Sequence, residues 1–531
     1  MTTTPSGPGA PGVEASAPPS RATDLALLGA TFVIAICGLV YELVAGSVSS
    51  YLLGDSVYHF SLVIGLFMTA MGVGAYLSRH VTDPEPAFVA AQIALGVVGG
   101  FSAMILFAAF ALIENYGAFL FLVSLTIGAL IGIEIPLVIR ILEGRDALKV
   151  TLSNVLTADY IGALAAALLF PLVLVPQLGL MGASFLLGSI NLAVAAMGLW
   201  LFRARCGTGI RALFALSVLA VWVGAWQSEA VLGGMERRLY ENEIVLALDT
   251  PYQRVVVARD GERVQLFLNG SIQFDTLDEH RYHESLVHPA MTRAPRIADV
   301  LILGGGDGMA VREVLRYPGV GRVTLVDIDA EVTALFRDHP MLAPLNGRAL
   351  SDPRVRIVNA DAWEFLKDGE IPFDVAILDL PDPKDLAVAK LYSRAFYAAL
   401  TARMAAGGTI VTQATSPLYA RKAFWTVEAT LAATRDPSQA APSATLRTLA
   451  TIPYHAYIPS FGEWGFVMAG ARLSEEPRRA LPDGLRFLDE AAFPAMRRFP
   501  ADMARLDMAP ATLFDQPLPR LYEEGWSAWF Q

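Results

Sequence analysis

Acidic side chains follow four predicted strands in the C-terminal half of this 531-residue sequence. Asp307 lies in the glycine-rich turn GGGDG after a short apolar run, and Asp327 ends the next apolar run, RVTLVDID. Further along, Asp361 follows RVRIVNA, and both Asp379 and Asp382 lie in DVAILDLPDP. Because open α/β sheets bind ligands at the carboxyl ends of their strands, we expect these acids to surround one site. Helix N-capping explains one or two such acids, but not all five.

The glycine cluster before Asp307 indicates what kind of ligand this site binds. Gly304, Gly305 and Gly306 separate a strand from a helical segment, which predicts close approach of the backbone to a nucleotide. Helix N-termini normally attract anions, so a carboxylate at Asp307 favours a ligand that carries positive charge. An adenosyl sulfonium suits a ring of carboxylates better than a dinucleotide phosphate does. S-adenosylmethionine has a carboxylate that Asp307 would repel, whereas decarboxylated S-adenosylmethionine keeps only the ammonium.

Composition divides the chain into two parts. Hydrophobic residues make up 54% and charged residues only 17% of the sequence, whereas soluble proteins have about 25% charged residues. The apolar excess precedes residue 230, which predicts a membrane domain there. The net charge of −11 argues against nucleic acid as a partner. Cys37 and Cys206 are the two cysteines, and they form neither a disulfide framework nor a metal site.

The N-terminal part is predicted to be a multi-span helical membrane domain. Residues 1–22 are rich in Thr, Pro, Ser, Gly and Ala and are expected to form a disordered tail. Within 23–230 we expect about seven helices, each close to the ~20 residues that span a bilayer. The predicted spans are 25–48, 60–78, 87–113, 117–139, 153–174, 180–202 and 211–230. Gly65, Gly72 and Ala75 recur at intervals typical of close helix packing.

The charges between the predicted spans bear on which side of the membrane the rest of the chain lies. Lys and Arg occur in alternate connections, whereas the intervening connections hold Asp55 and Glu114. The basic connections contain Arg79, Arg140, Arg145, Lys149, Arg203, Arg205 and Arg211. The positive-inside rule places these connections and the N-terminus in the cytoplasm, so seven spans would leave the C-terminal part outside. The chemistry expected of that part needs a cytosolic metabolite, and the sequence leaves both alternatives open.

Three acids lie within the predicted spans. Glu42, Glu134 and Asp159 are each surrounded by apolar sequence. Acids in hydrocarbon are costly, so they usually face the interior of a helix bundle or a cation path. One interpretation is an intramembrane cation or polyamine site. The alternative is that Glu134 pairs with Arg140 and that the other two acids form local hydrogen bonds.

The remaining sequence predicts a small antiparallel β-sheet followed by an α/β domain. Residues 231–290 contain alternating and β-branched runs joined by the turn Asp260–Gly261, and they end in the polar segment DTLDEHRYHES, which is typical of a surface loop. From 291 to 531 strands alternate with helical segments, the pattern of a Rossmann-like fold of the class I methyltransferase type. The last sixty residues predict short helices that pack against this domain.

Residues 240–530 resemble the spermidine synthase (polyamine aminopropyltransferase) family. The resemblance rests on the ordered motifs YQ, LNGSIQ, DEHRYHE, LGGGDGMAVREVLRY, VDID, NADAW, DLPDP, QATSP and PSFGEWGF. The N-terminal spans add a likeness to the membrane-integrated bacterial members of that family. It implies an enzyme in the bacterial inner membrane that acts on a diamine such as putrescine, with no bound metal or cofactor. We also expect a homo-oligomer.

The resemblance implies roles for residues that bind the aminopropyl donor, decarboxylated S-adenosylmethionine. Gln253 matches the glutamine that contacts the nucleoside, and Asp307 matches the acid that holds the aminopropyl ammonium. Asp327 corresponds to the acid that binds the ribose, and Asp361 to the acid that binds the adenine.

A second set of residues is implied on the side of the amine acceptor. Asp379 matches the acid that takes the proton of the attacking amine, and Asp382 matches the acid that binds the cationic part of the acceptor. Tyr282 and His283 match a pair between donor and acceptor, and Gln273 matches a further active-site glutamine.

One motif departs from the family. Soluble members read PTYPSG before WGF, with a tyrosine lining the acceptor pocket, whereas this chain reads IPSFGEWGF, with Phe461 and Glu463 nearby. Glu463 is either an additional cation contact or a solvent-exposed loop acid. Two other functions stay open: an S-adenosylmethionine-dependent methyltransferase, and a polyamine transporter or sensor with a ligand-binding domain.

Overall fold

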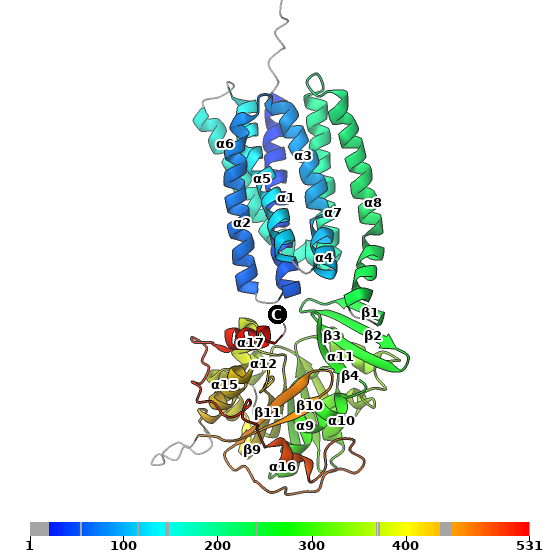
Figure 1. Ribbon diagram of the computed structural model, residues 1–531, viewed down its shortest axis with the longest axis vertical. Helices are drawn as coiled ribbons and strands as arrows, with labels where there is room; N and C mark the ends of the chain where they lie inside the picture. Colours follow the sequence, from blue (N-terminus) through cyan, green and yellow to red (C-terminus); the bar gives the residue numbers. More distant parts are fainter. Residues whose placement is uncertain are drawn as a thin grey trace, which may run out of the picture. The chain divides into compact units, whose positions relative to one another are not determined.

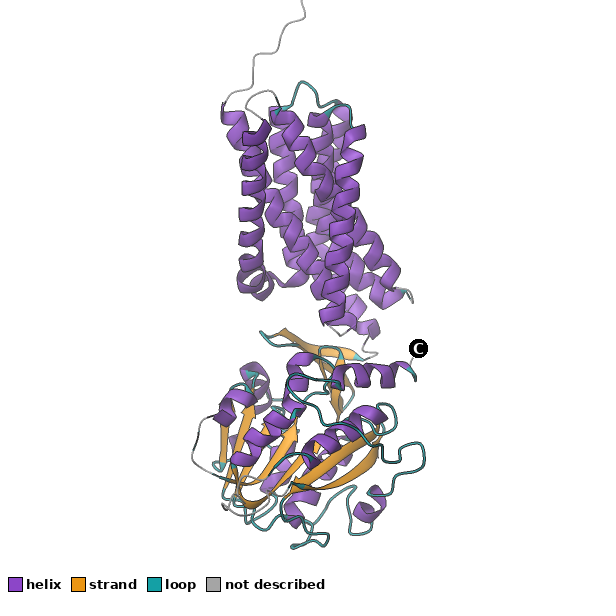
Figure 2. Cartoon of the chain, turned by 90° about the vertical axis from the view of Figure 1, so that its left-hand side faces the viewer, coloured by secondary structure: helices purple, strands orange, loops and turns teal. Residues whose placement is uncertain are grey.

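The protein forms two compact units, one all-helical and one mixed (Figure 1 and Figure 2). Contacts group residues 1–49 with 59–233, and residues 50–58 with 234–531. This computed structural model describes residues 21–53, 56–113, 116–143, 148–239, 242–367, 369, 372–435 and 448–529. Except for residues 21 and 22, the expected tail lies outside the described residues, as do Asp55, Glu114 and Arg145.

Long apolar segments form the helices of the first unit, because a helix satisfies its own backbone hydrogen bonds without water. These helices are α1 (Arg21–Leu53), α2 (Ser56–Leu77), η1 (Ser78–His80), α3 (Pro84–Gly100), α4 (Ser102–Leu112), α5 (Tyr116–Leu142), α6 (Leu148–Leu169), η2 (Phe170–Leu174), α7 (Val175–Leu201) and α8 (Thr208–Leu239). The expected span 87–113 corresponds to one helical segment, Pro84–Phe110, that is long and apolar enough to cross a membrane, and Phe101 divides it into α3 and α4.

Glycines bring α2 and α5 into close contact, but not the glycines that we expected. A Cβ at Gly74 would overlap the backbone of Ala129, and one at Gly132 would overlap the backbone of Met71. The expected packing of Gly65 and Gly72 is wrong, because a Cβ at either position meets nothing within 4 Å among the described residues. The spacing of small residues therefore predicts that the helix packs closely, but it does not predict which face of the helix makes the contact.

Six helical segments are long and apolar enough to cross a membrane, and the fifth, Leu148–Leu201, has 54 residues. This segment contains both α6 and α7, and Gly179 has a non-helical backbone with φ +64°. One buried cluster joins the first turns of α1, α3, α6 and α8 to the last turns of α5 and α7. Its buried members include Leu27, Phe88, Val155, Ile141 and Phe202, and the partly buried Ile210 packs against it. Helices α6 and α7 therefore run in opposite directions, and the start of α1 and the end of α8 lie at opposite ends of this unit.

The second unit begins with a four-stranded antiparallel sheet, as expected. Its strands, in the order β1-β2-β3-β4, are β1 (Glu243–Asp249), β2 (Arg254–Asp260), β3 (Arg263–Leu268) and β4 (Ser271–Asp275). Gly261 makes the β2–β3 turn with φ +59°, in the left-handed region that favours glycine.

A seven-stranded sheet of order β10-β11-β9-β8-β5-β6-β7 carries the rest of this unit. Its strands are β5 (Asp299–Gly304), β6 (Arg322–Asp327), β7 (Val355–Asn359), β8 (Phe373–Asp379), β9 (Met404–Gln413), β10 (Ala450–Ile458) and β11 (Gly462–Gly470). The five strands β5 to β9 are parallel to one another, and β11, which pairs with β9, and β10 close one edge in antiparallel fashion. The apolar residues 300–303 of β5 are fully buried, as expected of a central strand.

Helices connect and cover these strands. They are α9 (Glu279–Arg293), α10 (Met309–Leu315), α11 (Ala330–Asp338), η3 (Ala349–Ser351), α12 (Ala362–Lys367), α13 (Leu386–Ala389), η4 (Lys390–Tyr392), α14 (Arg394–Ala402), α15 (Arg421–Ala432), α16 (Ala492–Met496) and α17 (Leu518–Ser527). The loop-like reading of the polar segment before the glycine turn is wrong, because most of it forms the buried helix α9. Its charged residues are tolerated inside because they form ion pairs with one another and with α10.

Candidate active site

The glycine turn after β5 lies directly against Asp379 at the end of β8. Strands β5 and β8 are paired in parallel with Gly304 opposite Asp379. Gly304 and Gly305 have φ of +79° and +69°, and a Cβ at Gly305 would lie 2.9 Å from the Asp379 carboxylate. The turn therefore needs glycine both for its backbone conformation and for the room that the carboxylate occupies.

Asp379 is oriented by a phenol. The Tyr282 hydroxyl of α9 donates a hydrogen bond of 2.7 Å to Asp379 Oδ1, and the Tyr282 ring is buried against Phe461 and Phe466. Burial raises the pKa of Asp379 to about 6, while the nearby His283 cation and the Tyr282 hydrogen bond oppose that rise. Asp379 is therefore positioned and has the proton affinity of a general base that works near neutral pH.

Asp307 is part of the glycine turn itself. Its Oδ1 accepts a hydrogen bond of 2.8 Å from the backbone N–H of Met309, and Asn346 Nδ2 donates to its backbone carbonyl at 2.8 Å. Burial raises the pKa of Asp307, and the His283 cation opposes the rise. Asp307 and Asp379 also interact electrostatically with each other, so two acids share this end of the sheet and would both gain from a bound cation.

Asp327 is joined to the glycine turn through the backbone. Its two oxygens accept from the N–H groups of Gly306 at 3.0 Å and Asp329 at 2.8 Å. Burial raises the pKa of Asp327 to about 6. The side chain of Gln253 reaches the same corner, where it donates to Asp329 Oδ2 at 2.9 Å. Asp329, which the sequence did not single out, therefore connects the antiparallel sheet to the Rossmann-type sheet.

Asp361 is already engaged within the chain. It caps α12 by accepting from the backbone N–H of Trp363 at 2.7 Å, and it forms an ion pair of 3.0 Å with Lys390. Burial alone would raise the pKa of Asp361, but the Lys390 contact and the capping bond outweigh burial and lower it. One oxygen thus serves the helix cap while the other holds Lys390.

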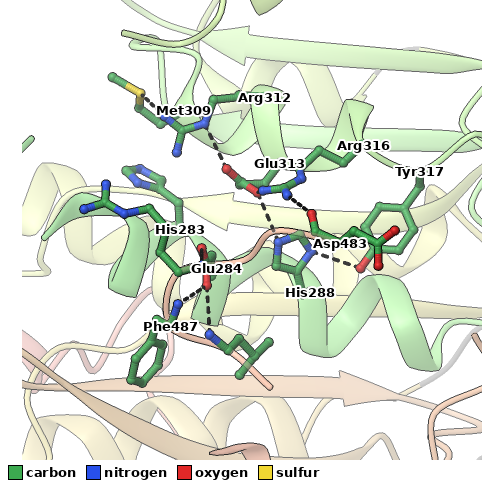
Figure 3. A network of polar contacts seen from close by, with 12 residues as sticks. His283, Glu284, His288, Met309, Arg312, Glu313, Arg316, Tyr317, Asp483 and Phe487 are labelled. Carbon is green, nitrogen blue, oxygen red and sulfur yellow. Dashed lines mark hydrogen bonds and ion pairs between the residues drawn. The ribbon is translucent and has the colours of Figure 1, made fainter. Parts of the chain in front are cut away.

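His283 is held as a buried cation by Glu279 of the same helix, beside a polar network that Figure 3 shows around Glu313. Its Nδ1 lies 2.8 Å from Glu279 Oε2, and Arg312 contacts the same carboxylate at 2.9 Å. Burial alone would lower the pKa of His283, but the Glu279 contacts outweigh burial and raise it to about 9. The network continues from Arg312 through Glu313 to His288. His283 therefore supplies a fixed positive charge beside Asp307 and Asp379.

Asp382 sits in a separate group of polar side chains, which includes residues that the sequence did not predict. Tyr522 of the C-terminal helix α17 donates to Asp382 Oδ2 at 3.0 Å, and Gln413 Nε2 lies 3.4 Å from Oδ1. Gln413 also donates to the Tyr392 hydroxyl and to the Leu380 carbonyl, both at 2.7 Å. Burial raises the pKa of Asp382 to about 6.

The departing motif PSFGEWGF contributes an aromatic ring rather than a cation contact. Phe461 packs edge-on against Tyr282 and also against Trp464. Glu463 is paired with His455 of the neighbouring strand at 2.5 Å, so it is neither of the two alternatives considered from the sequence. Gln273 bonds to the Ser271 carbonyl at 3.2 Å within its own strand.

The structure brings most of the predicted residues to one end of the sheet, although their roles stay predictions. Asp307, Asp327, Asp379 and Tyr282 are linked through the glycine turn. Among the described residues, no group of three His, Cys, Asp or Glu side chains is arranged to hold a metal ion. Such an edge can bind a cationic nucleoside, hold an amine beside it, and accept a proton.

The strand order and the glycine turn define a Rossmann-type fold of the class I methyltransferase kind. The spermine/spermidine synthase domain family matches residues 279–468. The chain is 44% identical to polyamine aminopropyltransferase 1 of Ralstonia nicotianae, over 97% of this chain and 98% of that protein. It is 41% identical to the polyamine aminopropyltransferase of Leptospira interrogans, over 94% and 99% of the two chains.

The chain therefore belongs to the spermidine synthase (polyamine aminopropyltransferase) family, and the expected aminopropyltransferase is confirmed. These relatives match nearly the whole chain, including the helical unit. Among solved structures, spermidine synthase from Thermotoga maritima is 25% identical with a TM-score of 0.42, and the match covers 48% of this chain and 84% of that chain.

Proposed function

We propose that this protein is a membrane-bound enzyme that transfers the aminopropyl group of decarboxylated S-adenosylmethionine to a diamine such as putrescine. The observation that carries the proposal is the group of carboxylates at the strand ends, next to a glycine turn that leaves room for them. The donor carries a sulfonium and an ammonium and no carboxylate. Asp307 and Asp379 therefore attract it, and it has no negative group that they would repel. Asp327, bonded to the turn at Gly306, is suited to the ribose hydroxyls.

Amine activation follows from the position of Asp379. A primary amine has a reference pKa of about 10, so at neutral pH it arrives protonated and is not a nucleophile. Asp379 takes the proton that the amine loses, directly or through water, while Tyr282 holds the carboxylate in place. Asp382, with Tyr522 and Gln413, binds the second ammonium of the diamine.

The transfer itself is a displacement at carbon. The amine lone pair forms a new N–C bond at the propyl carbon attached to sulfur, and the C–S electron pair leaves with sulfur as neutral methylthioadenosine. The sulfonium is already an activated leaving group, so the enzyme mainly has to align the two substrates. Alignment of this kind can lower the activation free energy by ~7–11 kcal/mol.

Exposed apolar side chains support a membrane location for the helical unit. On α8, Leu216, Leu219, Trp222 and Trp226 are 65%, 62%, 68% and 83% exposed. Monomeric soluble proteins rarely expose apolar surface of this kind over a whole helix. A lipid bilayer buries such a helix, which supports the bilayer as a partner of this unit.

The experiment that tests the proposal supplies each donor separately to the purified full-length protein with putrescine. Decarboxylated S-adenosylmethionine should yield methylthioadenosine and spermidine. Release of S-adenosylhomocysteine from S-adenosylmethionine would instead identify a methyltransferase. Asp379→Asn should lower turnover about 10²–10⁴-fold, the range for loss of a general base, while leaving donor binding intact. Turnover at the normal rate in this variant would show that Asp379 is not the base.

A further inference from the structure

Five side chains in the helical unit each keep one buried oxygen without a hydrogen-bond partner among the described residues. Glu85 is one of them, but it forms an ion pair with Arg205, and the Ser124 oxygen is a hydroxyl. The other three carry an amide or carboxylate oxygen. They are Gln92 of α3, Glu134 of α5 and Asn191 of α7, which are 0%, 2% and 0% exposed. The atoms without a partner are Gln92 Oε1, Glu134 Oε2 and Asn191 Oδ1. Buried polar atoms are almost always paired, so three unpaired acceptors in one bundle call for an explanation.

These side chains are linked to one another through α1. Gln92 Nε2 donates to the other oxygen of Glu134. Asn191 Nδ2 donates to the Tyr41 hydroxyl at 2.7 Å and to the Leu187 carbonyl at 3.2 Å. Glu134 is close enough to Tyr41 to interact with it electrostatically. Gln92 with Glu134, and Asn191 with Tyr41, are therefore two hydrogen-bonded pairs, which the close contacts of Gly96 and Gly99 with α7 and Tyr41 bring together inside the bundle.

Small residues allow four helices to converge on this polar group. A Cβ at Gly99 of α3 would overlap the Tyr41 ring, and one at Gly96 would lie 2.8 Å from Leu192 of α7. Gln92 lies one turn before Gly96 on the same face of α3, because positions four apart share a face. The Tyr41 ring and the Leu192 side chain thus occupy the space that these glycines leave open, one turn from Gln92 and next to Asn191 in the sequence.

Every unpaired atom in this group is an acceptor, and none is a donor. A ligand that completes the group must therefore supply N–H or O–H donors. It must also supply positive charge, because no Lys or Arg among the described residues forms a salt bridge with Glu134. An alkylammonium group has three donors, no acceptor and one positive charge. A metal ion that needs three acidic, His or Cys ligands fits less well, because the described residues contain no such group.

We propose that Glu134, Gln92 and Asn191 bind the protonated amino group of an alkylamine within the helical unit. This would be a second amine site in the chain, because the proposed acceptor site at Asp382 lies in the other unit. Asp159, which interacts electrostatically with Glu134, adds a second acid near this group. Glu42 carries no unpaired buried oxygen among the described residues, so the site does not include it.

The test counts bound amines in the full-length protein in lipid nanodiscs, using equilibrium dialysis with radiolabelled putrescine. The wild type should bind two molecules per chain, and Glu134→Gln should bind one. Asp382→Asn should also bind one, and the double variant none. Glu42→Gln is the matched control, because it removes another buried acid of the bundle, and it should still bind two.

Methylthioadenosine release, measured on the same preparations, separates this proposal from the proposed function. Glu134→Gln should release the product at the wild-type rate, which also shows that the variant is folded. If that variant does not fold, Asn191→Leu takes its place with the same expected loss of one bound amine. The proposal would be overturned if Glu134→Gln and Asn191→Leu both still bound two molecules of putrescine per chain. It would also be overturned if Glu42→Gln lost one bound molecule. A parallel dialysis uses labelled sodium. The proposal would also be overturned if the wild type retained sodium in place of putrescine and Glu134→Gln abolished that retention.

Discussion

The hydrogen bond from Tyr282 to Asp379 favours the ionised carboxylate, as the nearby His283 cation also does. Burial raises the Asp379 pKa to about 6, and the Tyr282 bond works against that rise. Because the base must be ionised, activity should fall as the pH drops through about 6. Removing the phenol in Tyr282→Phe should raise the Asp379 pKa further and move this acidic limb to higher pH by up to about one unit.

The measurement is kcat/KM against pH for the wild type and Tyr282→Phe, because kcat/KM reports groups of the free enzyme. Tyr454→Phe is the control. Tyr454 is also a buried tyrosine, but it donates to the Ser285 carbonyl rather than to an acid. The acidic limb of the pH profile of Tyr454→Phe should therefore stay where it is in the wild type. An unshifted limb in Tyr282→Phe would mean that another group controls the acidic limb.

Tyr522 provides a phenol to the acceptor side from outside the residues matched by the family domain, which end at 468. We expect it to take the place of the tyrosine that is missing from PSFGEWGF. Tyr522→Phe should raise the KM for the diamine about tenfold to a hundredfold, because hydrogen bonds to charged groups contribute about 1.5–3 kcal/mol. The KM for the donor should not change.

Steady-state kinetics with each substrate varied in turn measure this split between acceptor and donor. Tyr457→Phe, at an exposed tyrosine of β10, should leave both KM values unchanged. Equal increases in both KM values of Tyr522→Phe would indicate a general packing defect rather than a role in acceptor binding.

Helix α9 depends on its ion pairs, because it carries Glu279, His283 and His288 into the interior. The pKa of Glu279 is lowered to about 2, because the contacts with His283 and Arg312 outweigh its burial. Its contribution to stability is therefore present above the unfolded pKa of about 4.3 and is lost as the pH falls through about 2. The pKa of His283 is raised to about 9, so its contribution is complete below about 6.5 and is lost as the pH rises through about 9.

Arg312→Met removes the cation that Glu279 and Glu313 share. We expect a loss of about 3–5 kcal/mol at pH near 6, the range for a broken buried pair, and a smaller loss below about pH 4, where unpaired carboxylates are protonated. Denaturant unfolding at these two pH values measures both. Arg312→Lys keeps the charge without the two-pronged contact, so it should lose less. A loss independent of pH would show that Arg312 stabilises α9 by packing alone.

At the scale of the whole molecule, helix direction predicts the positions of the chain ends. The start of α1 and the end of α8 lie at opposite ends of the helical unit. In a bilayer, the N-terminal tail and the catalytic unit should therefore lie on opposite sides. Protease digestion of oriented vesicles, with a tag at each end of the chain, should remove one tag and spare the other.

This experiment also decides between the two expectations about sidedness. A cytosolic catalytic unit would agree with a cytosolic donor and make the helical unit an exception to the positive-inside rule. An external catalytic unit would agree with the charges and require the donor to leave the cytosol. Removal of both tags from the same side would contradict the helix directions. The homo-oligomer expected from the sequence stays a prediction.

The sequence by itself determined which residues line the end of the Rossmann-type sheet. Acids at strand ends and glycines in the turn are local signals, because strand alternation and backbone conformation depend on neighbouring residues. It also indicated an apolar helical unit, because hydropathy is a property of a short segment. Asp307, Asp327 and Asp379 could therefore be identified before their contacts were known.

The tertiary structure decided which distant residues complete these local groups. Tyr522 lies 140 positions from Asp382, and Arg312 lies 33 from Glu279, and no pattern in the sequence joins them. The polar segment of α9 was misread as a loop for the same reason, since its charges are neutralised by partners far along the chain. Gly65 and Gly72 were misread because spacing predicts that helices pack closely but not which face of each helix meets its neighbour.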